Sequence, residues 1–384
     1  MQTAVSLRYT HTRGKMPKQA YIIGLTGNIA SGKSVVRQML QNYGALTIDA
    51  DLLARRTYAR YAPAYDEIIS HFGVEIIDED NEIDRKKLGQ IVFSDPKQLK
   101  NLEQIVHPYT LDALEFILKH TRVNVIVLEM IKLLEIGLGE LCDSIWVCVA
   151  PDQVRAERLV KERSLSIHQA MDRINSQPAQ KLKIDQADVV IDTDCNFTRT
   201  WEQVQEGIDK EVIPVDKTPK PRWLGDSLWV RPLDFCEVIL CADFFSRLQG
   251  TSIQVEEVFK ILGTSSLMAY WHKEELVGLL NWRMANFVTL LIELISKPGQ
   301  TFPHTRRMLR IYESLSHQHL CEMFCISANA GLDMDGQRQF NYLLPDKFTN
   351  PAWHSLVARY LPQDTPVYYK ELTRMGQMVP MPEK

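Results

Sequence analysis

The chain has 384 residues, which is long for a single domain and sufficient for two. Its hydrophobic fraction of 45% and its charged fraction of 24% are typical of a globular protein. A net charge of −4 argues against a general affinity for nucleic acid or for an anionic membrane surface. No stretch approaches the roughly 20 apolar residues that span a bilayer, so we expect no membrane segment.

Cysteine usage and the first residues bear on location. The seven cysteines have no regular spacing, which argues against a disulfide framework and favours a reducing compartment. We therefore expect a cytoplasmic protein. Residues 1–19 lack the apolar core of a secretory signal, so we interpret them as a flexible leader. The sequence does not decide whether translation starts at Met1 or at Met16.

The first half of the chain alternates short apolar runs with helical segments. Ala20–Leu25 is an apolar run that ends in Thr26-Gly27, which predicts a buried strand. Ser31–Asn42 predicts a helix that Gly44 ends. The alternation predicts a parallel sheet with helices on both sides, a three-layer α/β/α fold. The further strands are expected at Ala45–Asp51, Val123–Glu129, Ser144–Ala150 and Ala187–Thr193, with Leu52–Lys119 mostly helical.

The pattern changes after Lys210. Val212–Gly225 carries three prolines and mixed charge, which predicts a linker before a second domain at residues 226–384. This second part mixes helical and strand patterns, which indicates an α+β fold. Helices are expected near Cys236–Leu248 and Thr305–Gln318, and strands at Leu267–Trp271, Leu276–Asn281, Phe287–Ile295 and Val367–Leu372.

Gly27–Ser34, with the sequence GNIASGKS, matches a phosphate-binding loop at every specified position. Glycines let the backbone N–H groups converge on phosphate oxygens, and the following helix adds its positive end. Lys33 would reach the β- and γ-phosphates, and the Ser34 hydroxyl would ligate Mg²⁺. The alternative is a chance match in a glycine-containing turn, but the predicted strand before and helix after are the context that the motif requires.

Two acids stand at the predicted end of the second strand. A kinase that phosphorylates a hydroxyl needs a carboxylate to orient that hydroxyl and take its proton. Asp49 and Asp51 are two residues apart, so both would project in the same direction from an extended backbone. The alternative is that an Asp caps the following helix, and one residue can serve each purpose.

Several motifs together resemble the dephospho-coenzyme A kinase family. They are "GLTGNIASGKS", "TIDADLLAR", "FGVEIIDEDNEIDRKKLGQIVF", "LEQIVHP" and "RINSQPAQKLKIDQADVVIDT", in the family's order and spacing over Tyr21–Val212. The resemblance implies a P-loop NTPase core at residues 20–211, with a helical acceptor domain and a mobile lid. It implies that ATP phosphorylates the ribose 3′-hydroxyl of dephospho-coenzyme A, the last step of coenzyme A synthesis.

The resemblance also implies residue roles. Asp51 would be the general base and Asp49 would support it, while His107 would lie in the acceptor-binding region. Arg158 and Arg163 would belong to the lid helix, with Arg173 and Gln177 in the next helix; the alternative for the first two is a solvated helix face. Lys33 would act with the lid arginines, Arg173 would bind the acceptor, and Ser34 and Glu129 would lie near Mg²⁺. The ATP contacts would be Gly27, Asn28, Ile29, Ala30, Ser31, Gly32, Lys33, Ser34 and Val35.

The chain departs from the family pattern on the acceptor side. Ile131 stands where the family usually has proline, Lys132 replaces an apolar residue, and Leu111 stands where many relatives have arginine. Two other hypotheses therefore stay open. One is a P-loop kinase that acts on a different small molecule, such as a nucleoside or nucleotide. The other is a non-catalytic, nucleotide-binding regulator.

The second part weakly resembles the GNAT acetyltransferase fold. The glycine-rich turn that holds the coenzyme pyrophosphate in that family is replaced by "SKPGQTFPHTRRM", which contains only Gly299. We expect a degenerate domain that packs on the kinase, binds a coenzyme A product or mediates oligomerisation; the sequence leaves these roles and the oligomeric state open. The spacing of His317, His319, Cys321 and Cys325 fits no zinc pattern, and "CEMFCISA" predicts a buried strand.

Overall fold

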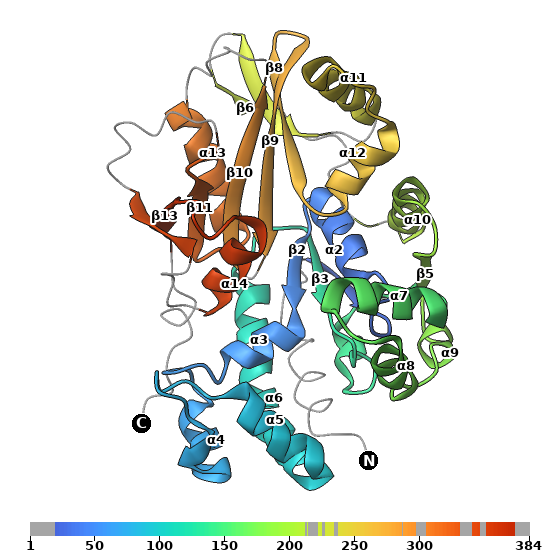
Figure 1. Ribbon diagram of the computed structural model, residues 1–384, viewed down its shortest axis with the longest axis vertical. Coiled ribbons are helices and arrows are strands. Elements are labelled where there is room, and N and C mark those ends of the chain that lie inside the picture. The colour runs from blue at the N-terminus through green and yellow to red at the C-terminus, as the bar shows by residue number, and fades with distance from the viewer. Residues whose placement is uncertain are drawn as a thin grey trace. The chain divides into compact units, whose positions relative to one another are not determined.

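The computed structural model describes most of the chain in two compact units (Figure 1). One unit is Ile48–Thr121, and the other combines Ala20–Thr47 with Arg122–Thr373. The expected leader lies outside the described residues, as does most of the expected linker. The described residues are 20–211, 213, 222–224, 227–233, 237–285, 287–296, 305–330, 340–345 and 351–372.

A five-stranded sheet with the order β2-β3-β1-β4-β5 forms the core of the first half. The pairs β1–β3, β1–β4 and β4–β5 are parallel, which confirms the predicted parallel α/β sheet. Helices connect and cover it as the alternating pattern predicts. The strands are β1 (Tyr21–Thr26), β2 (Leu46–Asp49), β3 (Val125–Glu129), β4 (Ser144–Val149) and β5 (Val189–Asp192); the helices are α2 (Lys33–Asn42), η2 (Leu138–Leu141), α7 (Asp152–Arg163), α8 (Ile167–Asn175), α9 (Lys181–Ile184) and α10 (Phe197–Lys210).

The unit at Ile48–Thr121 is helical, as expected. Its helices enclose a small core of their own around Ile68 and Ile76, both fully buried. Asp84 and Asp95 cap two of these helices by accepting backbone N–H groups. The elements are α3 (Ala50–Arg56), α4 (Tyr65–Phe72), η1 (Val74–Ile76), α5 (Arg85–Ser94) and α6 (Pro96–His120).

The prediction that Asp49 and Asp51 both project from an extended strand end is wrong. The Asp49 carboxylate accepts the backbone N–H of Leu52 at 2.9 Å, so α3 begins at Ala50. Asp51 therefore lies in the first turn of a helix rather than on a strand. Asp49 therefore caps α3, which is the alternative that the sequence left open for one of the two acids.

The second half forms an eight-stranded sheet with the order β12-β13-β11-β10-β9-β8-β7-β6. The pair β10–β11 is parallel, and the other described pairs are antiparallel. The strands are β6 (Arg222–Trp223), β7 (Leu228–Pro232), β8 (Ser266–His272), β9 (Glu275–Ala285), β10 (Val288–Ser296), β11 (Met323–Ser327), β12 (Asn341–Leu343) and β13 (Val367–Glu371), and the helices are α11 (Val238–Gln249), α12 (Val255–Leu262), α13 (Thr305–Gln318) and α14 (Pro351–Tyr360).

Some of these elements differ from the sequence prediction. Strand β6 lies inside the expected linker, where it pairs with β7, so this part of the proline-rich stretch is held in the sheet. Helices α12 and α14 were not predicted. The buried strand expected from "CEMFCISA" is confirmed as β11, all of whose residues are buried. Among the described residues, no three His, Cys, Asp or Glu side chains come together to hold a metal ion.

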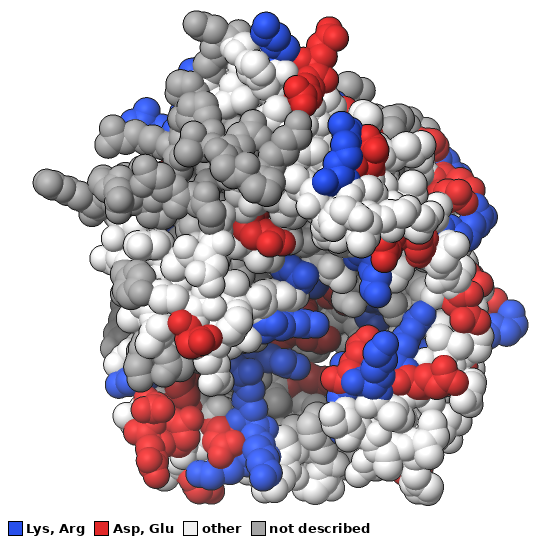
Figure 2. Space-filling model, turned by 45° about the horizontal axis from the view of Figure 1, so that its top comes forward, with Lys and Arg blue, Asp and Glu red and all other residues white. Residues whose placement is uncertain are grey.

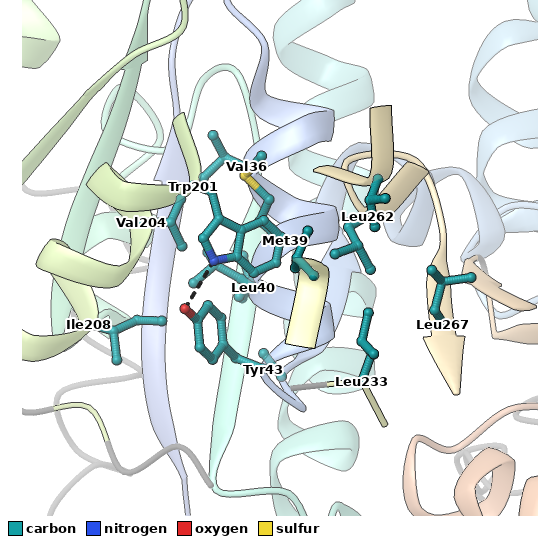
Figure 3. Close-up of a cluster of buried hydrophobic side chains, with 14 of the residues drawn as sticks. Val36, Met39, Leu40, Tyr43, Trp201, Val204, Ile208, Leu233, Leu262 and Leu267 are labelled. Carbon is teal, nitrogen blue, oxygen red and sulfur yellow. Dashed lines mark hydrogen bonds between the residues drawn. The ribbon is translucent and has the colours of Figure 1, made fainter. Parts of the chain in front are cut away.

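One hydrophobic core joins the two halves of the chain (Figure 3). Figure 3 shows Val36, Met39 and Leu40 of α2 and Trp201 of α10 facing side chains that come from beyond residue 230. The Trp201 indole N–H donates to the Tyr43 hydroxyl at 3.2 Å, which satisfies a polar group inside this core. The second-half side chains in this core include Leu233, Phe244, Phe245, Val258, Leu262 and Leu267.

The surface carries both signs of charge. On the face in Figure 2, Lys and Arg side chains are interspersed with Asp and Glu side chains, in keeping with totals of 44 and 48 in the sequence. Oppositely charged side chains also pair within one helix, as Lys119 and Glu115 do in α6. None of the described helices is long and apolar enough to cross a membrane.

His319 ties the end of α13 to the turn after α2. Its ring is buried; Nδ1 lies 3.0 Å from the Leu315 carbonyl, and the Gly44 backbone supplies a second hydrogen bond. Burial lowers the pKa of His319 below its ordinary value, although both backbone contacts oppose that shift. The neutral ring is therefore the form that folding favours.

We predict that acid weakens the fold through His319. Below the ordinary histidine pKa of about 6.5, the unfolded chain binds a proton that the buried ring resists, so stability present above that pH declines as the pH falls towards the folded-state pKa. Urea unfolding between about pH 7.5 and about pH 5.5 should show a smaller pH dependence for His319→Gln than for the wild type. His272→Gln, on the exposed end of β8, is the control. An unchanged pH dependence in His319→Gln would contradict this.

Candidate active site

The loop between β1 and α2 is folded as a tight cradle. Gly27 and Gly32 have φ angles of 144° and 82°, a region that side chains disfavour, and Ala30 also has a positive φ of 58°. A Cβ on Gly27 would lie 2.4 Å from the Cys148 carbonyl oxygen, and one on Gly32 would lie 2.8 Å from Thr193 Oγ1. Both glycines of the motif are therefore fixed by space as well as by backbone conformation.

Lys33 lies over this loop. Its Nζ donates to the carbonyls of Gly27 at 2.9 Å and Asn28 at 3.1 Å, and the residue is only 8% exposed. An ammonium group is thus held at the place where the glycine-rich backbone turns. Ser34, the next residue, lies exposed in the first turn of α2.

The loop also contains polar atoms that the described protein groups leave unpaired. Ser31 Oγ and Asn28 Oδ1 are buried and have no hydrogen-bond partner among the described residues. Buried polar atoms without partners are rare because each costs about 1–3 kcal/mol. A cradle lined by glycines, a lysine and the Ser31 hydroxyl, which can donate a hydrogen bond, fits a bound phosphate chain.

Thr193 holds the outer side of the loop, and sequence reasoning missed it. It follows β5, and its hydroxyl lies 3.0 Å from the Ser31 carbonyl, to which it donates. The same oxygen accepts from Arg158 Nη1 at 3.0 Å, while Arg158 also donates to the Ala30 carbonyl at 3.1 Å and to the Thr193 carbonyl. Arg158, which the family resemblance places in the lid, thus pins the loop to the end of β5.

A second set of contacts comes from around α8. The Gln177 side chain accepts the Ile29 N–H at 2.8 Å, and Asn28 donates to the Pro178 carbonyl at 2.8 Å. Gln177 lies just beyond α8 rather than inside the helix. Arg155, 2% exposed, lies within 3.5 Å of the Ile29 carbonyl and pairs with Asp152 at 2.5 Å. The loop is therefore held from both sides before any ligand binds.

The segment after β3 is held by buried charges. Glu129 pairs with Arg37 of α2, with 3.1 Å between Nε and Oε2. The Ile131 carbonyl accepts from Thr26 Oγ1 at 3.0 Å and from Lys183 Nζ at 2.6 Å. Lys132 itself is exposed. The departure from the family pattern at Ile131 thus lies in a segment that several hydrogen bonds fix.

Cys148 lies beneath the loop on β4. Its side chain is fully buried, and burial raises the pKa of the thiol to about 12, although Lys33 opposes the shift. The thiol therefore stays protonated at neutral pH, which excludes it as a nucleophile.

The other predicted residues lie on exposed or half-buried positions. Arg163 ends α7 and Arg173 lies near the end of α8, and both are exposed. Asp49, Asp51 and His107 belong to the helical unit and are half-buried there. Arg158 is the one predicted lid arginine that the structure brings to the phosphate loop.

These features define a class of protein. A parallel sheet, a loop of the form GNIASGKS between its central strand and a helix, and a lysine over that loop are the parts of a P-loop phosphotransferase. The family model for dephospho-CoA kinase matches residues 21–198. A dephospho-CoA kinase from Carboxydothermus hydrogenoformans is 40% identical over 186 residues, which cover 48% of this chain and 90% of that protein.

The chain therefore belongs to the dephospho-CoA kinase family, whose members are ATP-dependent kinases. The crystal structure of TT1252 from Thermus thermophilus is 30% identical and covers 50% of this chain and 98% of its own, with a TM-score of 0.47. An acetyltransferase from Streptococcus agalactiae is 10% identical and covers 38% of this chain and 100% of its own, with a TM-score of 0.27.

We predict that Thr193→Val weakens ATP binding about tenfold, because valine keeps the shape but removes the hydroxyl that bonds to the Ser31 carbonyl and to Arg158 Nη1, a loss of about 1–3 kcal/mol. Calorimetric titration with ATP and Mg²⁺ measures the change. Thr110→Val is the matched control, since the Thr110 hydroxyl donates to the Val106 carbonyl of its own helix. Equal ATP affinity of Thr193→Val and wild type would mean that Thr193 does not shape the loop.

Proposed function

We propose that this protein transfers the γ-phosphate of ATP to the ribose 3′-hydroxyl of dephospho-coenzyme A, forming coenzyme A and ADP. The observation that carries the proposal is the phosphate cradle, whose two glycines have no space for a side chain and whose lysine lies over the turn. Membership of the dephospho-CoA kinase family supports this choice of acceptor.

On the donor side, the loop residues bind the phosphates. Backbone N–H groups at the start of α2 and the ammonium of Lys33 neutralise phosphate charge, and Lys33 exchanges its bonds to loop carbonyls for bonds to phosphate oxygens. Mg²⁺, when bound, supplies further neutralisation of the β- and γ-phosphates. The Ser34 hydroxyl would hold it, with Glu129 nearby and oriented by Arg37.

On the acceptor side, we assign Asp51 as the general base. Asp49 caps α3, and Asp51 lies in the first turn of the same helix, at the position that the family resemblance gives to the base. A carboxylate at this position can accept the proton of a bound hydroxyl. His107 and Arg173 would bind the acceptor.

The arginines of α7 serve the migrating phosphoryl group. Its charge spreads over the equatorial oxygens, where a guanidinium is most effective. Arg158 is already fixed beside Ala30 of the loop, so we assign it to orient the donor. Arg163, exposed at the end of α7, would approach when the lid closes. We further propose that the enzyme works in the cytoplasm and takes small molecules as its substrates.

We predict that Asp51→Asn lowers kcat by about 100-fold or more, the usual contribution of a general base. Coenzyme A formation by the purified protein, followed by chromatography, measures it, and ATP affinity should stay unchanged. Asp66→Asn, an exposed acid in the first turn of α4, is the matched control. Full retention of activity in Asp51→Asn would overturn the assignment.

The same assay separates the donor side from the acceptor side and tests the acceptor. Lys33→Ala should lose ATP affinity as well as turnover, because its ammonium lies over the phosphate loop. If wild type phosphorylates a nucleoside or nucleotide faster than dephospho-coenzyme A, the acceptor is wrong. ATP binding without turnover on any acceptor would identify a regulator instead.

A further inference from the structure

Helix α12, from the second half of the chain, contacts α10 at its amino end, and at its carboxyl end it contacts α2, the helix that follows the phosphate loop. Figure 1 shows it beside α2 and α10, and all three belong to the same compact unit. The family match ends at residue 198, so α12 lies outside it. The kinase from C. hydrogenoformans is matched over 90% of its length by about half of this chain, so it has little further chain to supply such a helix.

The first contact is made by Glu256, in the first turn of α12. Its Oε1 accepts the Phe197 N–H at 2.7 Å, and its Oε2 accepts the Thr198 N–H at 3.2 Å and the Thr198 hydroxyl at 2.6 Å. Phe197 and Thr198 are the first two residues of α10, whose N–H groups have no partner within the helix. A carboxylate at the positive end of a helix is a charge-assisted anchor.

The residues that Glu256 binds lie close in sequence to Thr193, which holds the phosphate loop. Only residues 194–196 separate Phe197 from Thr193, whose hydroxyl and carbonyl bind Ser31 and Arg158. The short connection is itself fixed, since Asp192 accepts the Asp194 N–H at 2.9 Å and Asn196 accepts the Arg199 N–H at 2.8 Å. A shift of the α10 amino end therefore moves Thr193.

The second contact is made where α12 ends. A Cβ on Gly263 would lie 2.7 Å from two ring carbons of Phe197 and 3.3 Å from Val35 Cγ1, so the turn packs directly on α2 and α10. Asn42 donates to the Leu262 carbonyl at 2.7 Å, and Gln38 donates to Ser266 Oγ at 3.2 Å. Val35, Gln38 and Asn42 all lie on α2, the helix whose amino end forms the cradle.

We propose that the second half of this chain is a positioning element of the nucleotide site, acting through Glu256 and the turn at residues 262–266. Glu256 is the positioning residue: its carboxylate accepts hydrogen bonds from Phe197 and Thr198, and it acts on Thr193 through α10. Binding couplings are reciprocal, so bound ATP also stabilises α12. The inference rests on the proposed function in taking ATP as the ligand, and its kinetic readout takes dephospho-coenzyme A as the acceptor.

Glu256→Gln in the full-length protein tests this, because glutamine keeps the size and one acceptor oxygen but loses the charge and the second acceptor. Titration with ATP and Mg²⁺ should show an affinity about five- to tenfold weaker than wild type, and the KM for dephospho-coenzyme A should not change. Glu274→Gln, an exposed acid in the β8–β9 turn, is the matched control. A Glu256→Gln protein that is less stable but binds ATP as wild type does would overturn the proposal, since Glu256 would then be structural only.

Hydrogen exchange on the wild type tests the reciprocal effect without any variant. Adding ATP and Mg²⁺ should slow amide exchange in residues 255–262 and at the start of α10, beyond the effect seen in the β8–β9 turn. Unchanged exchange in α12 would overturn the coupling even if Glu256→Gln failed to fold. Wild type that binds ATP but does not phosphorylate dephospho-coenzyme A would refute the proposed reaction while leaving this test of coupling intact.

Discussion

Helix α2 has to meet two demands at once, and the rest of the structure depends on how it does so. Its amino end, with Gly32 and Lys33, forms the cradle for phosphate, while Val36, Met39, Leu40 and Tyr43 lie at the centre of the shared core. The spacing of three and four residues puts these apolar side chains on one face of the helix. A helix so buried cannot shift at its amino end without disturbing the packing along its length.

The cradle itself is held in a conformation that a free chain would avoid. Gly27, Ala30 and Gly32 have positive φ angles. For Ala30 this conformation is strained, because its side chain disfavours a positive φ that a glycine adopts readily. Hydrogen bonds from Arg158, Thr193 and Gln177 offset this cost by satisfying the loop backbone from outside. The N–H groups and the lysine are thus arranged before phosphate arrives, which is how electrostatic stabilisation becomes effective in a transition state.

The sequence predicted well what depends on local pattern. The five strands, α2 and the helical character of residues 52–119 follow from runs of apolar residues and from a motif whose spacing is itself the structure. The sequence pattern predicts Asp51 on an extended strand, which is wrong. The Leu52 N–H donates to the Asp49 carboxylate, and this cap starts a helix at Ala50. The roles of Thr193 and Glu256 could not be predicted from the sequence. Each depends on hydrogen bonds to backbone groups that are distant in the chain, and a single Thr after a strand or a single Glu on a helix does not indicate such partners. For Thr193, its place at the carboxyl end of a parallel strand was the available signal.

The way the second half is attached bears on what it can do. Domains joined only by a linker move independently, and their interfaces are small and polar. Here Trp201, Phe244 and Leu262 share a single core, and polar contacts around it include one to the Leu262 carbonyl and one at the amino end of α10. When one helix of a closely packed core moves, the helices packed against it have to move as well, because the core has few intermediate arrangements. A movement of α12 would therefore be passed to the phosphate loop through α2 and α10, the two helices that α12 contacts.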